Sequence, residues 1–550
     1  MIHKSPFGIH VPTDKPFTDI VIEALENHGD KTAIINAKTQ EEVTYKKIHE
    51  RSLTFASYLQ KSGFGKGDAA CSALQNCLEF PSLFLGVALQ GGVFCGTNSA
   101  FTEYELEQIF RICDPKIVFC QPSNLGKLLH VRDKILSIKE IIVVPEDNLA
   151  FEGPCPEGVT LLSEILKNPV SDYKSQVQID VRKDPLYLPH SSGTTGTPKG
   201  VMISHQNLAS GCGIFLEHNE KQIMQKIDPS YKLVDDHELI FQPIGFIFGF
   251  GVMLCSLIIG QTAVMMPKFD LELYCKCVET YKVRFLKMTP PLFLLLSKDP
   301  VVDKYDMTSV EAVVTGSAPL GKGLSSVAIK RFPKLKLVGQ CYALTEGFTV
   351  TMASYEPKCL EKLGTSGQLL PQLEMKIIDS ETGEAVGYGK PGEICVRGST
   401  VMIGYYKRPE ATAEAIDPEG WLHTGDVGYM DEDGFLFVVD RLKELIKVQG
   451  YQVPPAEIED ILLKHPGVKD AAVVGAPDEF AGEVPVAFVV TSEENTAKEK
   501  IMSFVNDQLS SYKHLKDVIF TEKIPKSITG KIARRELKQR LVDGIPSSSA

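Results

Sequence analysis

The chain has 550 residues, which is too long for one ordinary domain and predicts two or more. Hydrophobic residues make up 43% and charged residues 23% of the sequence, the composition of a soluble globular protein. The 58 Lys and Arg residues against 70 Asp and Glu give a net charge of −12, so the chain as a whole does not attract nucleic acid. Any anion-binding site must therefore be built locally.

The 13 cysteines are scattered and form no C-x-x-C pair; Cys275 and Cys277 are two positions apart. Residues 1–19 are polar and lack the apolar core of a secretion signal. Together these features predict reduced thiols in a cytoplasmic compartment and no zinc site. The last residues, 547–550, differ from the S-K-L signal, so a peroxisomal location is not supported.

In the first third of the chain, short apolar segments alternate with segments of helical spacing. Helices are predicted at residues 17–28 and at about 46–62, where Gly63 ends the second one. The predicted strands are residues 32–35, 43–45, 84–90, 117–119 and 141–144. Such alternation predicts parallel sheets covered by helices.

Residues 191–200, SSGTTGTPKG, contain three glycines, five hydroxyl side chains and one lysine. Glycines let backbone N–H groups approach an anion, the hydroxyls can donate further hydrogen bonds, and Lys199 adds a positive charge. This set of groups suits a polyphosphate, although the spacing differs from the P-loop pattern G-x-x-x-x-G-K-[ST]. Apolar residues 186–189 and 201–203 flank the stretch and predict two short buried strands with a hairpin-like connection, which argues against an ordinary surface linker.

Residues 239–267 contain no charged side chain and are long enough to span a bilayer. Glycine, proline and glutamine interrupt this stretch repeatedly. A buried strand, a buried helix at about 250–259 and a second strand account for it better than a membrane-spanning helix.

Beyond the uncharged stretch, a helix is predicted at 272–281 and a strand at 285–288, and the residues Thr289, Pro290 and Pro291 open the next helix. Two further strands are predicted: one near 313–315 runs into a turn with Gly and Pro at 316–320, and one at 335–338 is followed by a turn at 339–346. Ligands of open α/β sheets bind beyond the carboxyl ends of strands, so both turns are well placed for site residues. The alternative is that these residues serve only to form the turns.

The sequence pattern changes at residues 367–437, where short apolar runs and frequent glycines predict an antiparallel or barrel-like subdomain. Residues 440–443 separate it from a compact tail, which is predicted to be a small α+β domain. The predicted elements of the tail are a helix opened by Pro454 and Pro455, strands at 471–474 and 484–490, and a helix at about 498–509.

The stretch SSGTTGTPKGV, residues 191–201, resembles the phosphate-binding signature of the adenylate-forming enzymes. These include acyl-CoA synthetases, 4-coumarate–CoA ligases, beetle luciferases and peptide-synthetase adenylation domains. The resemblance covers nearly the whole chain and implies an α/β fold. It divides the chain into a large N-terminal domain of layered αβαβα sheets with a β-barrel-like subdomain (1–439), a hinge (440–443) and a small mobile α+β C-terminal domain (444–550).

The resemblance implies a two-step reaction with ATP, Mg²⁺ and coenzyme A. A carboxylate attacks the α-phosphorus of ATP to give acyl-AMP and pyrophosphate, and the thiol of coenzyme A then takes the acyl group. Such chemistry depends mainly on positioning and on neutralising charge. The pattern is most similar to the 4-coumarate–CoA ligase-like and acyl-CoA synthetase branch, an AMP-forming acid–thiol ligase of fatty acid metabolism or aryl-acid activation.

The resemblance also assigns roles to single residues. It implies that Glu346 assists Mg²⁺, that Thr345 contacts the α-phosphate and that Tyr342 stacks on adenine. Asp426 is expected to accept both ribose hydroxyls, with Arg441 as the second ribose contact. The implied nucleotide-binding set is Ser191, Ser192, Gly193, Thr194, Thr195, Gly196, Lys199, Gly316, Ser317, Ala318, Gln340, Cys341, Tyr342, Ala343, Asp426, Arg441 and Lys443. A turn aspartate and a core tyrosine are the alternatives for Asp426 and Tyr342.

Two lysines of the small domain are implied to serve different steps. Lys531, after Gly530, matches the lysine that reaches the carboxylate and α-phosphate during adenylation, where a cation must bridge two anions. A solvated basic tail is the alternative. Lys447 lies on the face that is implied to replace Lys531 after the domain rotates about the hinge. The implied coenzyme A contacts are Lys268, Gln449 and Gly450.

The sequence departs from the family pattern around the acyl site. Phe246 stands where many relatives carry a histidine, and Cys341 and Ala343 flank Tyr342 where relatives carry glycine. Gln449 replaces a frequent lysine, which puts its coenzyme A contact in doubt. Phe246, Phe248 and Ala343 are predicted to line the substrate pocket, and Phe250 is placed near it, which favours an apolar acyl or aryl chain.

Two other functions stay open: a luciferase-like oxygenase that uses the acyl-adenylate, and a non-catalytic nucleotide-binding relative. A carrier-bound adenylation module is disfavoured because no carrier-like segment follows Lys538. The expected partners are a small carboxylic acid and coenzyme A, without nucleic acid or a transmembrane span. Peripheral membrane contact, and either a monomer or a homodimer, are compatible with the sequence.

Overall fold

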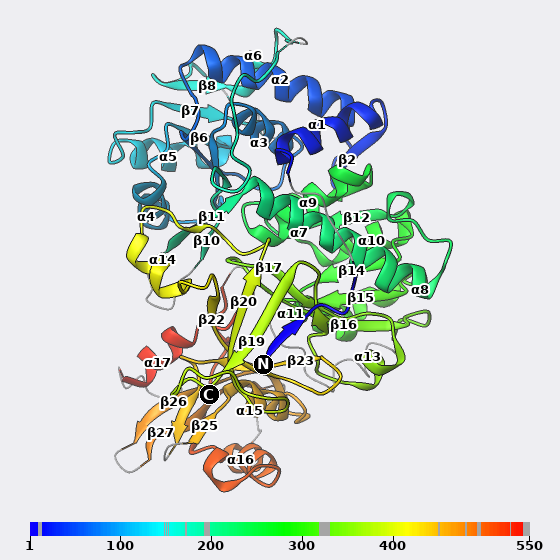
Figure 1. Ribbon diagram of the computed structural model, residues 1–550, viewed down its shortest axis with the longest axis vertical. Coiled ribbons are helices and arrows are strands. Elements are labelled where there is room, and N and C mark those ends of the chain that lie inside the picture. Colours follow the sequence, from blue (N-terminus) through cyan, green and yellow to red (C-terminus); the bar gives the residue numbers. More distant parts are fainter. Residues whose placement is uncertain are drawn as a thin grey trace.

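Five β-sheets and the helices around them make up the described part of the chain in the computed structural model (Figure 1). The structure describes residues 1–8, 14–147, 149, 151, 153–170, 173–191, 198–317, 331–448, 451–478, 481–491, 497–527 and 530–542, and for Gln452 the backbone alone.

The first sheet has a parallel centre. Its order is β10-β11-β9-β5-β4-β6-β7-β8, with β21 paired to β11. The strands are β4 (Ala69–Ala73), β5 (Val93–Gly96), β6 (Ile117–Cys120), β7 (Glu140–Val143), β8 (Val159–Leu161), β9 (Pro185–Tyr187), β10 (His190–Ser191), β11 (Lys199–Ser204) and β21 (Gly404–Tyr405). The associated helices are α2 (Tyr45–Lys61), α3 (Phe80–Leu89), α4 (Glu103–Cys113), α5 (Leu125–Arg132) and α6 (Leu162–Ile165). The predicted parallel strands covered by helices are confirmed here.

The second sheet follows the order β12-β13-β2-β3 and holds the uncharged stretch. Its strands are β12 (His237–Ile240), β13 (Thr262–Met265), β2 (Thr32–Asn36) and β3 (Glu42–Thr44). Helix α9 (Ile247–Ile259) joins β12 to β13 as a buried crossover, as predicted. Among the described residues, no helix has both the length and the hydropathy to cross a bilayer. Helices α1 (Phe17–His28), α7 (His205–Glu217) and the short α8 (Gln225–Ile227) lie beside it, and a π-helical segment, η2 (His218–Met224), links the last two.

The third sheet, β14-β15-β16-β17-β18, also begins with parallel strands. It consists of β14 (Phe285–Met288), β15 (Ala312–Thr315), β16 (Leu337–Leu344), β17 (Phe348–Met352) and β18 (Gln368–Leu369). The helices around it are α10 (Leu271–Tyr281), α11 (Pro290–Lys298) and α13 (Pro357–Glu361). Short 3₁₀ turns occur at η1 (Pro122–Asn124), η3 (Leu233–Asp235), η4 (Pro300–Lys304) and η5 (Ser511–Lys513).

The fourth sheet is antiparallel, as predicted for residues 367–437. Its order is β1 (Ile2–Lys4), β19 (Leu373–Ile378), β20 (Gly392–Gly398), β22 (Leu422–Met430) and β23 (Leu436–Arg441), with α14 (Pro409–Ala415) between β21 and β22. Residues at the start of the chain therefore supply one edge of a sheet that is otherwise built from its last third.

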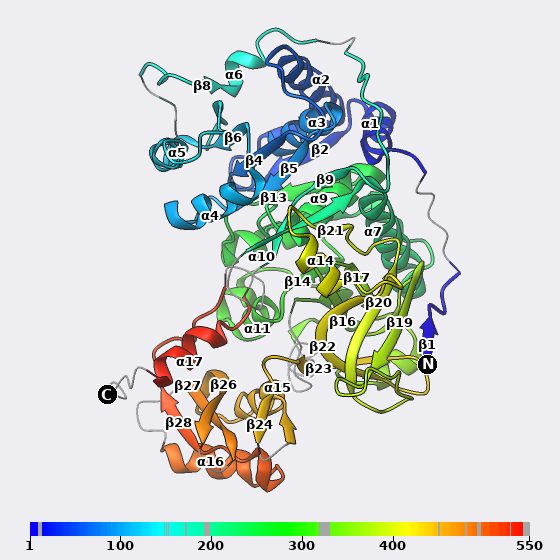
Figure 2. The ribbon, with the colours of Figure 1, turned by 60° about the vertical axis from the view of Figure 1, so that its left-hand side comes forward.

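Residues 446–542 form a fifth sheet with a core of its own at one end of the molecule (Figure 2). The elements are β24 (Ile446–Val448), β25 (Tyr451–Val453), α15 (Pro455–Leu462), β26 (Val468–Asp478), β27 (Gly482–Thr491), α16 (Lys498–Asn506), β28 (Asp517–Phe520) and α17 (Arg534–Val542). Ile458, Ile461 and Leu462 are buried on the inner face of α15, as the helical spacing predicts.

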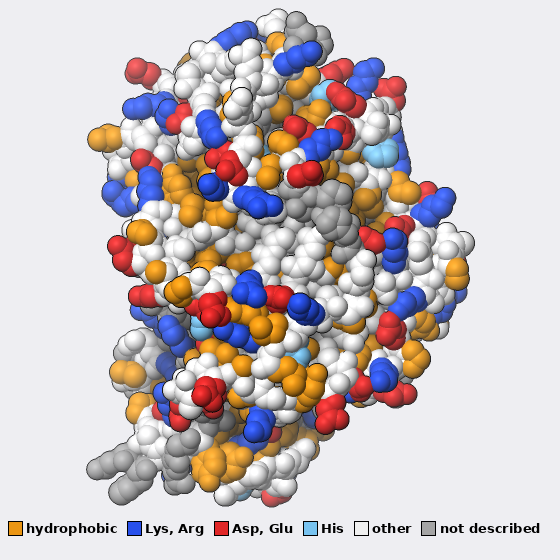
Figure 3. Space-filling model, viewed as in Figure 1, with side chains coloured by type: hydrophobic (Ala, Val, Ile, Leu, Met, Phe, Trp, Pro, Cys, Tyr) orange, Lys and Arg blue, Asp and Glu red, His pale blue; other side chains and the backbone are white. Residues whose placement is uncertain are grey.

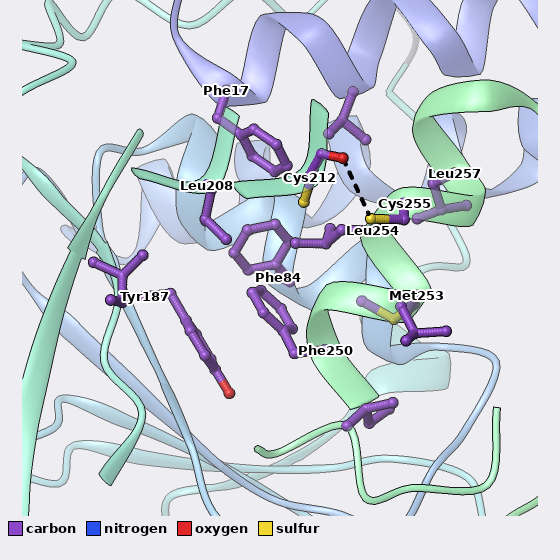
Figure 4. Close-up of a cluster of buried hydrophobic side chains, with 14 of the residues drawn as sticks. Phe17, Phe84, Tyr187, Leu208, Cys212, Phe250, Met253, Leu254, Cys255 and Leu257 are labelled. Atoms are coloured by element: carbon purple, nitrogen blue, oxygen red, sulfur yellow. Dashed lines mark hydrogen bonds between the residues drawn. The ribbon is translucent and has the colours of Figure 1, made fainter. Parts of the chain in front are cut away.

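The core between the first two sheets is built from aromatic rings (Figure 4). The rings of Tyr187 and Phe250 stack with centroids 3.9 Å apart, and Phe84 meets Phe250 edge to face at 4.9 Å. All three side chains are completely buried. Phe250 is therefore part of the aromatic core, and its place near the substrate pocket stays a prediction.

Two predicted elements differ from the structure. Residues 84–90 were expected to be a strand, but 84–89 belong to α3, and every residue of that helix is buried. A helix without an exposed face has no polar positions that reveal the helical period. An apolar run of this length can therefore be either a buried helix or a buried strand. The segment 339–346 was expected to be a turn, but β16 continues to Leu344 and only then turns into β17.

Charged side chains of both signs are interspersed on the face shown in Figure 3, without a large basic region there. This distribution agrees with the net charge of −12. Attraction for an anionic ligand must come from a local arrangement of groups.

We expect Phe84→Ala to lower the free energy of unfolding by about 3–5 kcal/mol, because it leaves a cavity among the rings of Phe94 and Phe250. Urea unfolding followed by circular dichroism measures the change. Leu136→Ala is the control, since this side chain is 84% exposed and should shift stability by less than about 0.5 kcal/mol. Equal effects of the two substitutions would contradict the described core.

Candidate functional site

The two ends of the SSGTTGTPKG stretch form the arms of a hairpin. Strands β10 and β11 are antiparallel, with Ser191 opposite Lys199 and His190 opposite Gly200. The strand predicted at 201–203 lies within β11, and the one at 186–189 overlaps β9. The predicted site residues Ser192, Gly193, Thr194, Thr195 and Gly196 lie outside the described residues.

Lys199 and Glu346 are brought together through Tyr405. Strand β21 pairs with β11, and the Lys199 ammonium lies 4.7 Å from the centre of the Tyr405 ring. The Tyr405 hydroxyl donates a 3.0 Å hydrogen bond to Glu346 Oε1, and the Met402 N–H donates to the Glu346 carbonyl oxygen at 2.8 Å. Glu346 thus sits in the turn between β16 and β17, not at the start of a helix, with its carboxylate oriented by Tyr405.

Asp426 is held between Tyr342 and Arg441. The Tyr342 hydroxyl donates to Asp426 Oδ2 at 2.6 Å, and Arg441 Nε lies 3.4 Å from Oδ1. Asp426 stands opposite Arg441 in the pairing of β22 with β23, which explains why residues fifteen positions apart meet. Burial raises the pKa of the Asp426 carboxyl, whereas Arg441, the Tyr342 hydrogen bond and Lys531 act in the opposite direction.

The backbone before Asp426 is supported from strand β20. Glu393 accepts a 3.1 Å hydrogen bond from the Gly425 N–H through Oε1, and its Oε2 lies 3.0 Å from His423 Nδ1. The Thr424 hydroxyl donates to the Ile394 carbonyl oxygen at 2.7 Å. These contacts fix the turn that carries Asp426. Sequence reasoning missed Glu393 and Tyr405, because strand pairing brings them to the site from distant positions.

Lys531 reaches the same region from the small C-terminal part. Its N–H donates to Ser527 Oγ at 3.1 Å, and the Ser527 N–H donates to the Lys531 carbonyl oxygen at 2.7 Å. Gly530 has a φ of 82°, and a Cβ atom there would lie 3.3 Å from Pro291 Cγ at the start of α11. The loop before α17 therefore touches the large N-terminal part (Figure 2).

Charged groups of the large N-terminal part act on the pKa of Lys531. Loss of water around its ammonium ion lowers the pKa of Lys531, and Arg441 lowers it further, whereas Asp426 and Glu346 raise it. The residue as a whole retains exposed surface. Lys531 thus lies within the electrostatic reach of both predicted nucleotide-binding carboxylates.

Lys447 lies elsewhere in the small part. It is exposed on β24, and its N–H donates to Glu483 Oε2 at 2.9 Å within the fifth sheet. Lys268 and Lys443 are also exposed, while Gln449 and Gly450 lie outside the described residues. The structure brings the Lys531 face to Asp426, and the Lys447 face is not part of this arrangement of described residues.

The segment predicted to be the hinge contacts the small C-terminal part at both of its ends. Asp440 Oδ2 accepts from the Ala456 N–H at 3.2 Å, and Arg534 Nη1 donates to Glu444 Oε2 at 2.8 Å. Arg534 also makes two 2.7 Å hydrogen bonds to the buried Glu459 carboxylate. Burial raises the pKa of Glu459 to about 7, against the opposing charge of Arg534.

The ends of β15 and β16, which carry predicted nucleotide contacts, lie side by side. A Cβ atom on Gly316 would lie 2.7 Å from Cys341 Sγ, so glycine is needed for this close approach. Ser317 has a φ of 76°, a conformation that is costly for serine and that occurs often at ligand sites. Gln340 is buried, Cys341, Ala343 and Thr345 are half-buried, and Ala318 lies outside the described residues.

Phe246 and Phe248 lie at the start of α9 and are half-buried. The ring of Phe246 lies edge to face with that of Phe101 at 6.2 Å. The preceding loop is fixed by close backbone packing, since a Cβ atom on Gly245 would lie 2.0 Å from the Thr97 carbonyl oxygen. An apolar ring thus occupies a rigidly placed position at the end of the second sheet.

Comparison with known proteins places this arrangement in a family. The AMP-binding enzyme model matches residues 21–406, and the model of the AMP-binding enzyme C-terminal domain matches residues 457–531. The chain is 36% identical over 548 residues to 4-coumarate–CoA ligase 1 of Arabidopsis thaliana, covering 98% of this chain and 94% of that protein. It is 38% identical over 542 residues to 4-coumarate–CoA ligase 1 of Petroselinum crispum, covering 98% and 96%.

Solved structures show the same fold. ATP-bound MatB from Rhodopseudomonas palustris aligns with a TM-score of 0.83 at 25% identity, over 96% of this chain and 99% of that one. The anthranilate CoA ligase AuaEII, solved with anthranoyl-AMP, aligns with a TM-score of 0.85 at 23% identity, over 97% and 98%, and supports the fold alone. The chain therefore belongs to the AMP-binding family of adenylate-forming enzymes, in the acyl-CoA synthetase and 4-coumarate–CoA ligase-like branch of AMP-forming acid–thiol ligases.

Proposed function

We propose that this enzyme activates an apolar carboxylic acid, fatty or aryl, as acyl-AMP and transfers the acyl group to coenzyme A. Two observations carry the proposal: Gly530 of the small part packs against Pro291 of the large part, and Lys531, next to Gly530, interacts electrostatically with Asp426 and Glu346. A nucleotide bound between these groups would meet a ribose acceptor, a metal-binding carboxylate and a mobile cation in one place.

Asp426 suits the ribose. A carboxylate has two oxygens with several lone pairs, so it can accept hydrogen bonds from both ribose hydroxyls while Tyr342 holds Oδ2 and Arg441 lies beside Oδ1. The Tyr342 hydroxyl thereby fixes both the carboxylate and the position of its own ring. We infer that this ring stacks on adenine, with the close-packed ends of β15 and β16 beside it.

Glu346 suits Mg²⁺. The ion prefers oxygen ligands and binds through one or two carboxylates together with phosphate oxygens, and the half-buried Glu346 carboxylate offers such a donor next to the arms of the phosphate hairpin. When bound, Mg²⁺ would neutralise phosphate charge. The Tyr405 hydroxyl keeps the Glu346 carboxylate oriented. Lys199, on the hairpin arm β11, lies over the same tyrosine ring and adds positive charge there.

Lys531 suits the first step of the reaction. An acid carboxylate and the α-phosphate repel each other, and a cation between them lowers the barrier to attack. The attacking oxygen forms a bond to phosphorus while the bond to pyrophosphate breaks. The electrostatic interaction of Lys531 with Asp426 and Glu346 supports this role.

We propose further that the chain divides into a large domain (1–439), a hinge (440–443) and a small domain (444–550) that changes orientation between the steps. Arg534 ties Glu444 and Glu459 together, so Glu444 would move with the small domain. The Leu442 N–H donates to the Gly425 carbonyl oxygen at 2.8 Å, so residue 442 would stay with the large domain and the pivot would lie between Leu442 and Glu444. The rotation would break the hydrogen bond from the Ala456 N–H to Asp440. Rotation would withdraw Lys531 and present Lys447 for attack of the coenzyme A thiol on the adenylate carbonyl.

The apolar rings of Phe246 and Phe248 favour an apolar acyl or aryl chain. Phe246 replaces the histidine that many relatives carry and has no group that can transfer a proton. It can stabilise a bound acid only through apolar contact and shape. Proton transfer in the thiol step must then use another group, such as the phosphate of the adenylate itself.

We expect Lys531→Ala to slow adenylate formation by about a hundredfold or more, because the bridging cation is lost. Attack of coenzyme A on supplied acyl-adenylate should stay close to the unaltered rate, since that step uses the other face. Single-turnover assays of the two half-reactions separate the effects.

The control for this experiment is Lys526→Ala. Lys526 lies on the same loop but pairs with Asp470 at 2.5 Å, so both half-reactions should persist. Equal loss of both half-reactions in Lys531→Ala would contradict the two-orientation proposal. Nucleotide binding without acid-dependent turnover in the unaltered enzyme would favour the non-catalytic alternative.

We expect Phe246→Ala to raise the Michaelis constant for a preferred apolar acid by about tenfold, through loss of about 1.4 kcal/mol of apolar contact. The Michaelis constant for ATP should not change. Steady-state kinetics with each substrate varied in turn tests this, and Phe215→Ala, a half-buried ring on α7, is the control. If only the Michaelis constant for coenzyme A changed, Phe246 would line the thiol path instead.

A further inference from the structure

A buried asparagine, Asn76, joins loops that belong to two different sheets. It follows β4 of the first sheet and is 4% exposed. Its Nδ2 donates to the carbonyl oxygens of Gln242 and Met266, at 3.0 Å each, and its Oδ1 accepts from the Ile244 N–H at 2.9 Å. Gln242 and Ile244 follow β12, and Met266 follows β13. One side chain of the first sheet therefore holds the backbone of two loops of the second.

The chemistry of an amide explains why asparagine stands at this position. An amide side chain offers two N–H donors and one carbonyl acceptor, and the three backbone partners of Asn76 use all of them. Aspartate has the same size but no N–H donor, and leucine has neither a donor nor an acceptor. The partner residues are also buried, so the loops are expected to shift when these hydrogen bonds are lost.

A second hydrogen bond holds the same loop, residues 242–246, from the first sheet. The hydroxyl of Tyr187, at the end of β9, donates to the Gly245 carbonyl oxygen at 2.8 Å. The Tyr187 ring is itself fixed, because it stacks on Phe250 in the core (Figure 4). A Cβ atom on Gly96, the last residue of β5, would lie 2.2 Å from the same Gly245 carbonyl oxygen. Loop 242–246 is thus held by three separate segments of the first sheet.

This loop lies where α/β sheets bind their ligands. Ligands lie beyond the carboxyl ends of the strands, and Asn76, loop 242–246 and Met266 all follow the carboxyl ends of parallel strands. The loop ends at Phe246, whose ring is half-buried and meets that of Phe101, beyond the carboxyl end of β5. Ordinary anchoring of a loop is the alternative, and it would make Asn76 important for stability alone.

We propose that Asn76 is a positioning residue for the carboxylic acid: by holding loop 242–246, it keeps the Phe246 ring in place at the wall of the acid pocket. The inference rests on the proposed function, in which Phe246 contacts the acid. A displacement of the bound acid by about an ångström can cost a hundredfold in rate, because the attacking oxygen then misses the α-phosphorus. Asn76 acts through the loop and does not itself touch the acid.

The test compares acid kinetics of full-length Asn76→Ala and Tyr187→Phe, with straight-chain fatty acids and aryl acids as substrates. We expect kcat/KM for the acid that the unaltered enzyme prefers to fall about tenfold or more in Asn76→Ala, which loses three hydrogen bonds, and about threefold in Tyr187→Phe, which loses one. The KM for ATP should stay within about twofold, because the predicted ribose and adenine contacts lie on other sheets. Hydrogen exchange followed by mass spectrometry should be faster in loop 242–246 of both variants.

Tyr45→Phe is the matched control. Tyr45 is completely buried, as Tyr187 is, and its hydroxyl donates to the Gln261 carbonyl oxygen at 2.9 Å, beyond the opposite end of α9 from Phe246. This variant loses the same kind of hydrogen bond beside the same helix. Its acid kinetics and the exchange of loop 242–246 should nevertheless match those of the unaltered enzyme.

The outcomes separate this inference from the proposed function. Unchanged acid kinetics in Asn76→Ala and Tyr187→Phe, with acid-dependent pyrophosphate release by the unaltered enzyme, would overturn the inference and leave the proposed function standing. An equal loss in Tyr45→Phe, or an equal rise in the KM for ATP, would also overturn it, since stability alone would then explain the effect. No acid-dependent release by the unaltered enzyme would overturn both. Tyr187→Phe removes a single oxygen atom, so it keeps the test valid should Asn76→Ala fail to fold.

Discussion

The predicted nucleotide site depends on one buried carboxylate, that of Asp426. Burying such a group is unfavourable unless hydrogen bonds and an opposite charge replace water. The Tyr342 hydroxyl and the Arg441 guanidinium provide that replacement, and Glu393 holds the turn before it through the Gly425 N–H. Because Tyr342 belongs to the third sheet and Asp426 to the fourth, this interaction also fixes how the two sheets meet. Tyr342 and Asp426, the predicted adenine and ribose contacts, are thereby joined by one hydrogen bond.

The second constraint is the position of the small C-terminal part. Gly530 packs against Pro291 of α11, which carries Lys531 towards Asp426 and Glu346. Several short contacts near the hinge, such as those of Arg534 with Glu444 and Glu459, make the small part a coherent unit. A rigid unit joined through a short segment can present either of two faces with little internal change. Under the proposed rotation, such a unit would serve both steps of the reaction.

Much of the fold could be predicted from local sequence pattern. Helix α1 at 17–28 and strand β14 at 285–288 have the predicted bounds, because amphipathic spacing and short apolar runs are local signals. The strand predicted at 84–90 was wrong because α3 is buried on all sides and shows no polar period. The sequence could not tell that Phe250 is completely buried whereas Phe246 is half-buried, since both lie near the start of one apolar segment. Only the tertiary structure shows that Phe250 packs on Tyr187 in the core.

Parts of the candidate site had no sequence signal that could have been used. Tyr405 reaches Glu346 because β21 pairs with β11, and Glu393 reaches the turn before Asp426 because β20 pairs with β22. Such contacts are set by topology, and a single sequence contains no spacing rule for them. The motif residues Lys199, Asp426 and Lys531 were predictable because the family resemblance covers them, and their roles stay predictions.

The measurement that tests the account most directly is pyrophosphate release from ATP with a panel of fatty, aryl and polar acids, with and without coenzyme A. We predict release that depends on apolar acids, and thioester that accumulates only when coenzyme A is present. Release that is independent of every acid in the panel, or thioester formation restricted to polar acids, would contradict the account.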